Sequence, residues 1–144
     1  MYQNILLPTD GSAGTQKAIE QALDLAATYD ATLHALYVID TAAFAPEVDV
    51  GLIIDTLKEN GKNALAEIND QAVEAGIVTE TTIESGSPHR EILRYIDDND
   101  IDLVVMGTHG RKGLGRYLLG SVTEKVVRSS LVPCLTVRMT ETDD

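Results

Sequence analysis

The sequence predicts a single α/β domain in which a five-stranded parallel sheet carries helices on both faces. Three observations predict this fold class. Short runs of Leu, Ile and Val alternate with longer segments whose apolar residues recur at helical spacing. The apolar runs are nearly continuous, as expected of parallel strands that are buried on both faces. The length of 144 residues suits one domain with one hydrophobic core.

The first half of the chain predicts two strands and two helices. Residues 4–8, NILLP, form an apolar run followed by the turn residues TDGSAG, which indicates a buried strand that ends in a loop. Residues 12–28 have the apolar periodicity of a helix, and residues 31–39, ATLHALYVI, are rich in strand-forming residues. An irregular segment at 41–51 leads to a long helix that we expect to end near Gly76.

The second half predicts three more strands and two more helices. Residues 77–84 form the third strand, and Pro88 suits the first turn of the helix that follows. Residues 101–107, IDLVVMG, are the clearest strand, residues 121–130 form the last helix, and residues 132–138 form the last strand. We expect the strand order 3-2-1-4-5, in which the first strand lies beside the fourth. Ligands of such sheets bind where neighbouring crossovers leave in opposite directions, beyond the strands' carboxyl ends.

The excess of acidic over basic residues and the absence of long apolar runs limit the expected partners and location of the protein. The chain has 23 acidic and 11 basic residues, with a formal net charge of −12, and this opposes nonspecific binding to nucleic acid or to anionic membranes. No apolar run is long enough to span a membrane and no leader is visible, so we expect a cytoplasmic protein. The acidity, with only five lysines, also suits an acidic surface of the halophilic type. We expect the domain to cover 1–140, followed by an acidic tail at 141–144.

The stretch GTHGRKGLGRYLLGS, residues 107–121, has a different charge from the rest of the chain. It contains five glycines and three cations, among them Arg111, and no acid. Gly120 and Ser121 open the last predicted helix, whose unpaired N–H groups and positive dipole end favour an anion. Glycines upstream allow the backbone to approach a phosphate closely. The stretch therefore predicts a binding site for an anionic ligand.

Several known fingerprints are absent from this stretch and from the rest of the sequence. After Gly110-x4-Gly115 the chain has Arg116 where a Walker loop needs Lys, and the spacing of a dinucleotide-binding loop is also missing. No Gly-x-Ser-x-Gly elbow gives a serine the context of a nucleophile. The single cysteine, Cys134, excludes an intrachain disulfide. We therefore expect no dedicated catalytic constellation.

The spacing that does fit is Gly107-x2-Gly110-x9-Gly120-Ser121, which resembles the nucleotide-binding signature of the universal stress protein family. The segments ILLPTDGS and ALYVID are similar to that family's first two strands, and the C-terminal half from DLVVMG to LTVR is similar almost position by position. The resemblance implies a flavodoxin-like (Rossmann-like) α/β domain that forms a homodimer and binds ATP, with Mg²⁺ or Mn²⁺ as the accompanying metal.

The resemblance also implies a set of cofactor-binding positions at or just after the ends of three strands: Pro8, Thr9, Asp10, Val38, Gly107, Gly110, Gly120 and Ser121. We add Arg111, which follows Gly110, and Val122, which follows Ser121; a solvated basic face is the alternative role for Arg111. The glycines and Ser121 would hold the phosphates. Asp10 would approach the ribose or the metal–phosphate region, and Val38 would contact adenine. A helix cap is the alternative role for Asp10, and a plain core position is the alternative for Val38.

These observations lead to one main functional hypothesis and two alternatives. The main hypothesis is an ATP-binding regulatory stress-response protein, a homodimeric switch that pairs through its C-terminal strand and acts on an unknown protein partner. The first alternative is an enzyme that hydrolyses ATP slowly or phosphorylates itself, on Ser121 or a nearby hydroxyl. The second is an interaction module that binds no nucleotide.

Overall fold

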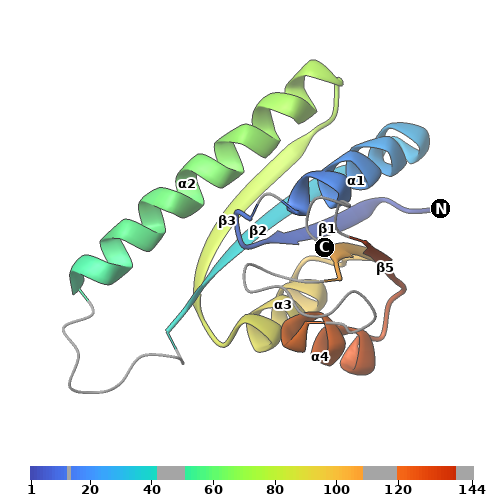
Figure 1. Cartoon of the computed structure of the whole chain (residues 1–144). Helices are drawn as coiled ribbons and strands as arrows, with labels where there is room; N and C mark the ends of the chain where they lie inside the picture. Colours follow the sequence, from blue (N-terminus) through green and yellow to red (C-terminus); the bar gives the residue numbers. More distant parts are fainter. Residues whose placement is uncertain (13, 42–50, 109–119, 139–144) are drawn as a thin grey trace.

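The computed structural model describes residues 1–12, 14–41, 51–108 and 120–138, which form an α/β fold with strands and helices in alternation (Figure 1). The elements are β1 (Asn4–Thr9), α1 (Thr15–Tyr29), β2 (Thr32–Asp40), α2 (Gly51–Glu74), β3 (Thr79–Gly86), α3 (Pro88–Asp98), β4 (Leu103–Gly107), α4 (Ser121–Ser129) and β5 (Cys134–Val137). The strands form one sheet in the order β3-β2-β1-β4-β5, and every neighbouring pair is parallel. The predicted fold class and strand order are confirmed.

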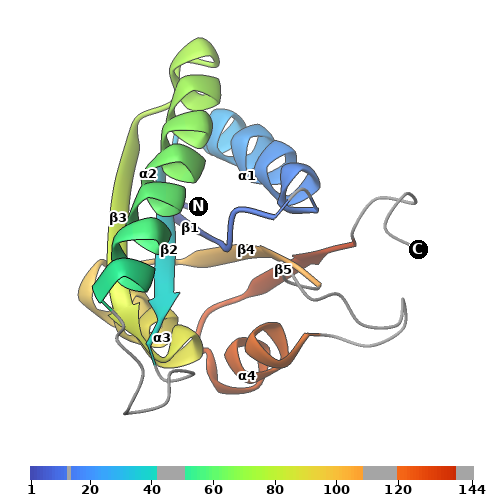
Figure 2. The same cartoon turned by 60° about the vertical axis from the view of Figure 1, so that its left-hand side comes forward.

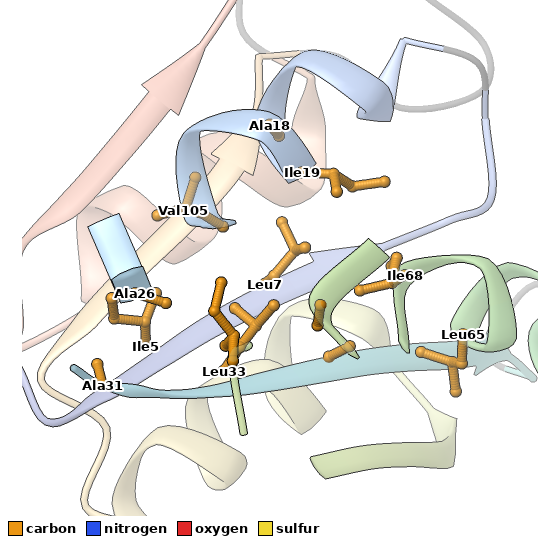
Figure 3. Close-up of a cluster of buried hydrophobic side chains, with 14 of the residues drawn as sticks. Ile5, Leu7, Ala18, Ile19, Ala26, Ala31, Leu33, Leu65, Ile68 and Val105 are labelled. Carbon is orange, nitrogen blue, oxygen red and sulfur yellow. The ribbon is translucent and has the colours of Figure 1, made fainter. Parts of the chain in front are cut away.

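Helices cover both faces of the sheet. Along β1, Ile5 and Leu7 pack into a cluster with α1 and α2, while Leu6, between them, packs into a cluster with α3 and α4. This alternation follows from the two-residue period of a strand. Figure 2 shows α1 and α2 on one side of the sheet with α3 and α4 on the other, and Figure 3 shows the side chains of the first cluster. In the described part of the chain, no helix combines the length and the apolar character of a bilayer span.

Most element boundaries lie close to those predicted, and the differences have local causes. The first helix begins at Thr15 and not at residue 12, because the chain first makes a turn in which the Asp10 carboxylate accepts the Ser12 N–H. The last strand is shorter than predicted and begins at Cys134. Most of the irregular segment 41–51 and all of the acidic tail 141–144 lie outside the described residues.

Helix α2 approaches the sheet closely at one glycine. Gly61 lies over Tyr37 of β2, and a Cβ atom at Gly61 would lie 2.7 Å from Cδ1 of that ring. Tyr37 itself is buried. Carbon atoms in normal contact are about 3.5 to 4.0 Å apart. A glycine at this position therefore allows the long helix to lie against β2.

Candidate functional site

A pocket of about 240 Å³ lies at the carboxyl ends of β1, β2 and β4. β1 pairs with β2 on one side and with β4 on the other, so the crossovers that leave these strands diverge at this place. The pocket opens on the face of the sheet that α3 and α4 cover, because residues from both of these helices line it. The described residues that line it are Pro8, Thr9, Asp10, Thr15, Leu36, Val38, Asp40, Pro88, Ile92, Met106, Gly107, Val122 and Thr123.

The interior of the pocket is apolar. Leu36 comes from β2 and Met106 from β4, the strands on either side of β1, and Ile92 comes from α3. All three side chains are buried. Val38 is half-buried and lies near the end of β2. Aliphatic side chains of this kind can pack against the faces of a flat ring. The interior therefore suits an aromatic or heterocyclic group.

The loop between β1 and α1 forms the polar side of the pocket. Asp10 Oδ1 accepts the backbone N–H of Ser12 at 2.9 Å and the Thr15 hydroxyl at 3.5 Å. Thr9 Oγ1 accepts the N–H of Gly11 at 3.0 Å, and Gly11 has a φ of 79°, which favours glycine. The N-cap of α1 is Gly14, which has no side chain with which to cap the helix, and the contacts of Asp10 hold the turn that precedes it.

The first turn of α4 is fastened to the end of β4. The buried Thr123 hydroxyl donates to the carbonyl of Gly107 at 2.8 Å, and the N–H of Gly120 donates to the carbonyl of Thr108 at 2.6 Å. Gly120 is the N-cap of α4 and has an extended backbone, and Ser121 is exposed. The N-terminal end of the α4 dipole therefore lies beside the pocket, where it favours negative charge.

The structure brings together six of the predicted site residues around this pocket: Pro8, Thr9, Asp10, Val38, Gly107 and Val122. Gly120 and Ser121 do not line it but begin the helix whose next residues do. Gly110 and Arg111 lie outside the described residues.

Three polar residues of the pocket, Thr15, Asp40 and Thr123, were not among the predicted site residues. Asp40 ends β2 two residues after Val38, so its place at a strand's carboxyl end was the available signal. The role of Thr123 depends on how α4 packs against β4, and no sequence pattern indicates it. Asp40 is exposed and adds a second carboxylate to that of Asp10. Over the described ranges, no cluster of His, Cys, Asp or Glu side chains has the arrangement of a metal site.

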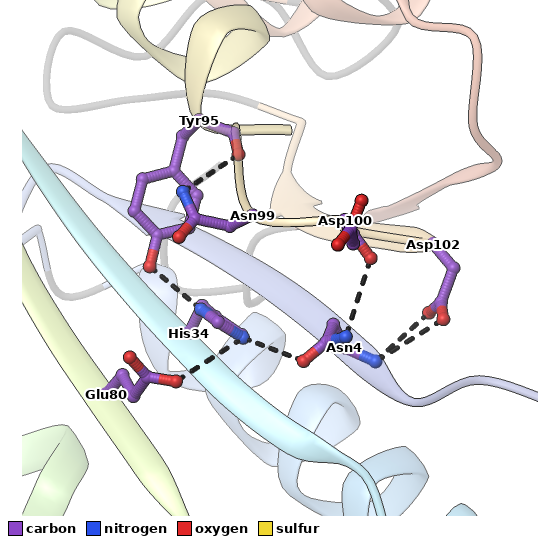
Figure 4. A network of polar contacts seen from close by, with 7 residues as sticks. All are labelled: Asn4, His34, Glu80, Tyr95, Asn99, Asp100 and Asp102. Atoms are coloured by element: carbon purple, nitrogen blue, oxygen red, sulfur yellow. Dashed lines mark hydrogen bonds and ion pairs between the residues drawn. The ribbon is translucent and has the colours of Figure 1, made fainter. Parts of the chain in front are cut away.

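A separate polar network lies at the opposite end of the strands and involves His34, Asn4, Tyr95 and Glu80 (Figure 4). His34 on β2 is only 3% exposed; its Nε2 lies 3.0 Å from Asn4 Oδ1 and its Nδ1 lies 2.8 Å from the Tyr95 hydroxyl. Since the amide oxygen can only accept, Nε2 carries the proton and Tyr95 donates to Nδ1.

Burial favours the neutral form of His34. Burial lowers the pKa of His34, and the nearby carboxylates of Glu80 and Asp102 act in the opposite direction with a smaller effect. The Nε2 atom of His34 lies 4.0 Å from Glu80 Oε2. Because His34 does not line the pocket, we interpret the network as a structural link between β1, β2 and α3.

Comparisons with known proteins cover the whole fold. The model of the universal stress protein family matches residues 1–138. Universal stress protein MJ0531 of Methanocaldococcus jannaschii is 38% identical over 141 residues, which cover 96% of this chain and 83% of that protein. The solved structure of MJ0577, from the same archaeon, has a TM-score of 0.88 at 32% identity and covers 98% of this chain and 99% of its own.

A third comparison concerns a solved structure described as a universal stress protein in complex with cAMP. Its TM-score is 0.76 at 27% identity, and the match covers 96% of this chain and 99% of that one. The similarity in all three cases extends along the whole α/β fold and is not confined to the glycine-rich stretch.

Proposed function

Since the chain belongs to the universal stress protein family, we propose that it is an ATP-binding regulatory protein that works as a homodimer. The observation that carries this proposal is one pocket that combines an apolar interior with the first turn of α4. The interior suits a purine, and a helix start suits a phosphate. The related structure described as a cAMP complex supports an adenine nucleotide as the class of ligand.

The adenine ring is proposed to lie in the apolar interior. Leu36, Ile92 and Met106 are buried and surround this space from the sheet and from α3, and Val38 adds a half-buried side chain from β2. Packing the ring there removes its apolar faces from water. Burial of apolar surface contributes about 25 cal/mol per Å².

The two carboxylates of the pocket determine where the phosphates can lie. Asp10 and Asp40 would repel a phosphate at close range, so we expect the phosphates to point away from them, toward Gly107 and the start of α4. The predicted phosphate contacts of Gly120 and Ser121 agree with this direction, and those of Gly110 and Arg111 remain a prediction. A carboxylate is suited to accept the hydroxyl groups of a ribose. A divalent cation bound with the phosphates would reduce the remaining repulsion from Asp10.

Calorimetric titration with Mg-ATP, ADP, AMP, cAMP and GTP tests the proposal. We expect adenine nucleotides to bind and Asp10→Ala to weaken binding by roughly ten- to a hundredfold, since a hydrogen bond to a charged group contributes about 1.5 to 3 kcal/mol. Asp24→Ala on the exposed surface of α1 is the matched control, because it removes the same charge away from the pocket. Absence of binding at millimolar Mg-ATP would contradict the proposal and favour a nucleotide-free interaction module.

Two further measurements separate binding from turnover. Chromatography of any nucleotide released by heating the purified protein identifies the preferred ligand. Phosphate release, with the intact mass measured after incubation with ATP, tests slow hydrolysis and phosphorylation of Ser121. An unchanged mass and no phosphate release would leave a binding protein without catalytic activity.

The homodimer is proposed to form through β5. Within the described part of the chain, β5 is an edge of the sheet; Leu135 and Thr136 on this strand are exposed, and so is Leu131 just before it, at 94%. An uncovered edge can pair with a second copy of itself across a twofold axis. Nucleotide occupancy would then alter the surface that the dimer presents to a protein partner. Light scattering at micromolar concentration, with and without ATP, measures the association state.

A further inference from the structure

A second concave region lies on the opposite face of the sheet, between α1 and α2. This α1–α2 groove has a volume of about 550 Å³, within the range of small-molecule sites. Its floor is apolar and comes from both helices, with Ile19 on α1 and Ala64 and Ile68 on α2. Figure 2 shows the two helices side by side over the same face of the sheet. The pocket proposed for the nucleotide lies on the other face, under α3 and α4.

The walls of the groove carry amides and hydroxyls. Asn60 and Asn63 on α2 are exposed and line the groove, and their side-chain amides make no hydrogen bond within the described part of the chain. Gln16 on α1 faces them, and its side-chain amide pairs in both directions with that of Gln71, at 3.1 and 3.4 Å. This amide pair links the two helices and keeps Gln16 at the groove. The hydroxyl of Thr9 adds a donor from the end of β1, since its oxygen accepts from Gly11.

Charge in the groove excludes most other ligand classes. Among the described residues that line it, Glu67 is the only charged side chain, and it is exposed. A phosphate or carboxylate would be repelled by Glu67 and by the formal net charge of −12. A cation would meet a single solvated carboxylate, which gives little binding energy. The chemistry of the groove is therefore that of uncharged groups.

We propose that the α1–α2 groove is a second binding site, for a small neutral molecule with several hydroxyl groups, such as a polyol or a sugar. Each hydroxyl of such a molecule both donates and accepts, and so does each side-chain amide of Asn60 and Asn63. The amide NH2 group of Gln16 already donates to Gln71 and Glu20, so its oxygen, which accepts one hydrogen bond, is the atom that can accept from the ligand. The C–H groups of the same molecule can pack on the apolar floor. Because the described lining residues include no aromatic ring for a sugar to stack on, we expect millimolar affinity.

Nuclear magnetic resonance on ¹⁵N-labelled, nucleotide-free protein tests the site. The side-chain amide signals of asparagine and glutamine are followed during titration with glycerol, myo-inositol and trehalose. We expect at least one of these to shift the signals of Asn60, Asn63 and Gln16 along a saturable curve. Myo-inositol 1-phosphate should bind more weakly than myo-inositol, because Glu67 repels the added phosphate.

A paired set of variants locates the binding. The double variant Asn60→Ala, Asn63→Ala should weaken the affinity by about tenfold, as expected for the loss of two neutral hydrogen bonds. Asn69→Ala, on the same helix but outside the groove, should leave it unchanged. Both variants should fold, since alanine is a better helix former than asparagine, and circular dichroism checks this.

Three results would overturn the proposal. These are shifts that never saturate with any of the three neutral compounds, an equal loss of affinity in Asn69→Ala, and tighter binding of the phosphorylated inositol. The variants leave the nucleotide pocket unaltered, because Asn60, Asn63 and Asn69 do not line it, so nucleotide binding can be tested separately.

Discussion

Replacing Gly61 by alanine should destabilise the protein, although glycine to alanine in a helix usually stabilises. In a helix with free space at this position, the change would raise the free energy of unfolding by about 1 kcal/mol, because alanine has the higher helix propensity. Here the new methyl group would lie 2.7 Å from Cδ1 and 3.1 Å from both Cγ and Cε1 of Tyr37. Cγ lies next to the backbone, so the ring cannot swing clear without a new rotamer or a shift of α2. Overpacking of this kind costs about 1 to 3 kcal/mol.

The net expectation for Gly61→Ala is a loss of about 1 kcal/mol, which lowers the melting temperature by about 3 °C in a domain of this size. Urea unfolding and thermal scans measure both quantities. Ala66→Gly, at an exposed position of the same helix, calibrates the propensity difference. In a Tyr37→Ala background the three contacting ring atoms are absent, and Gly61→Ala should become stabilising. An equal stabilisation of wild type and Tyr37→Ala by this change would refute the packing argument.

Four further predictions concern the first turn of α4, the polar network of His34, the edge strand β5 and the acidic surface. Thr123→Val should cost about 1 to 3 kcal/mol in urea unfolding by leaving the Gly107 carbonyl without its donor, and Thr123→Ser should retain most of the stability. The pKa of His34 is lowered in the folded state, so the unfolded chain binds the proton more readily. The free energy of unfolding should therefore fall as the pH drops below about 6.5. His34→Gln should reduce this pH dependence between about pH 7.5 and 5.5. Leu135→Arg on β5 should give monomers in light scattering, with circular dichroism showing that the fold is retained, and an intact dimer would exclude β5 as the interface. A formal net charge of −12 predicts a melting temperature that rises between low and molar KCl, and an unchanged value would argue against a surface of the halophilic type.

The fold could be predicted because its strands are buried on both faces and therefore appear as nearly continuous apolar runs. The strand order also placed the loop of Asp10 next to the end of β4, and the structure has these two segments at one pocket. Helix starts were less predictable, since the turn at Asp10 delays α1 by a few residues. Local sequence cannot show contacts that depend on packing between distant elements. Thr123 against Gly107 and Gly61 against Tyr37 are contacts of this kind.

Polar residues were likewise predictable only where the local sequence has a distinctive pattern. Asp40 was missed because a single carboxylate at the end of a strand has no distinctive spacing, whereas the glycines of residues 107–121 have one. The environment of the buried His34 could not be predicted either, because its partners Asn4 and Tyr95 are far away in the sequence. Its neutral state, which burial favours, could not be derived from the strand pattern alone.

The short connection between β1 and α1 separates two compartments. Thr9 and Thr15 line both the pocket under α3 and α4 and the groove between α1 and α2. A ligand in the pocket can fix the rotamer of Thr15 or the turn that Asp10 holds. Because Thr9 and Thr15 also line the α1–α2 groove, the same ligand then fixes part of the surface that a ligand in the groove contacts. Thermodynamic linkage requires the effect to be mutual, so that each occupant changes the other's dissociation constant by the same factor. The few residues of the connection between β1 and α1 would then couple the binding of two chemically different ligands in this small domain.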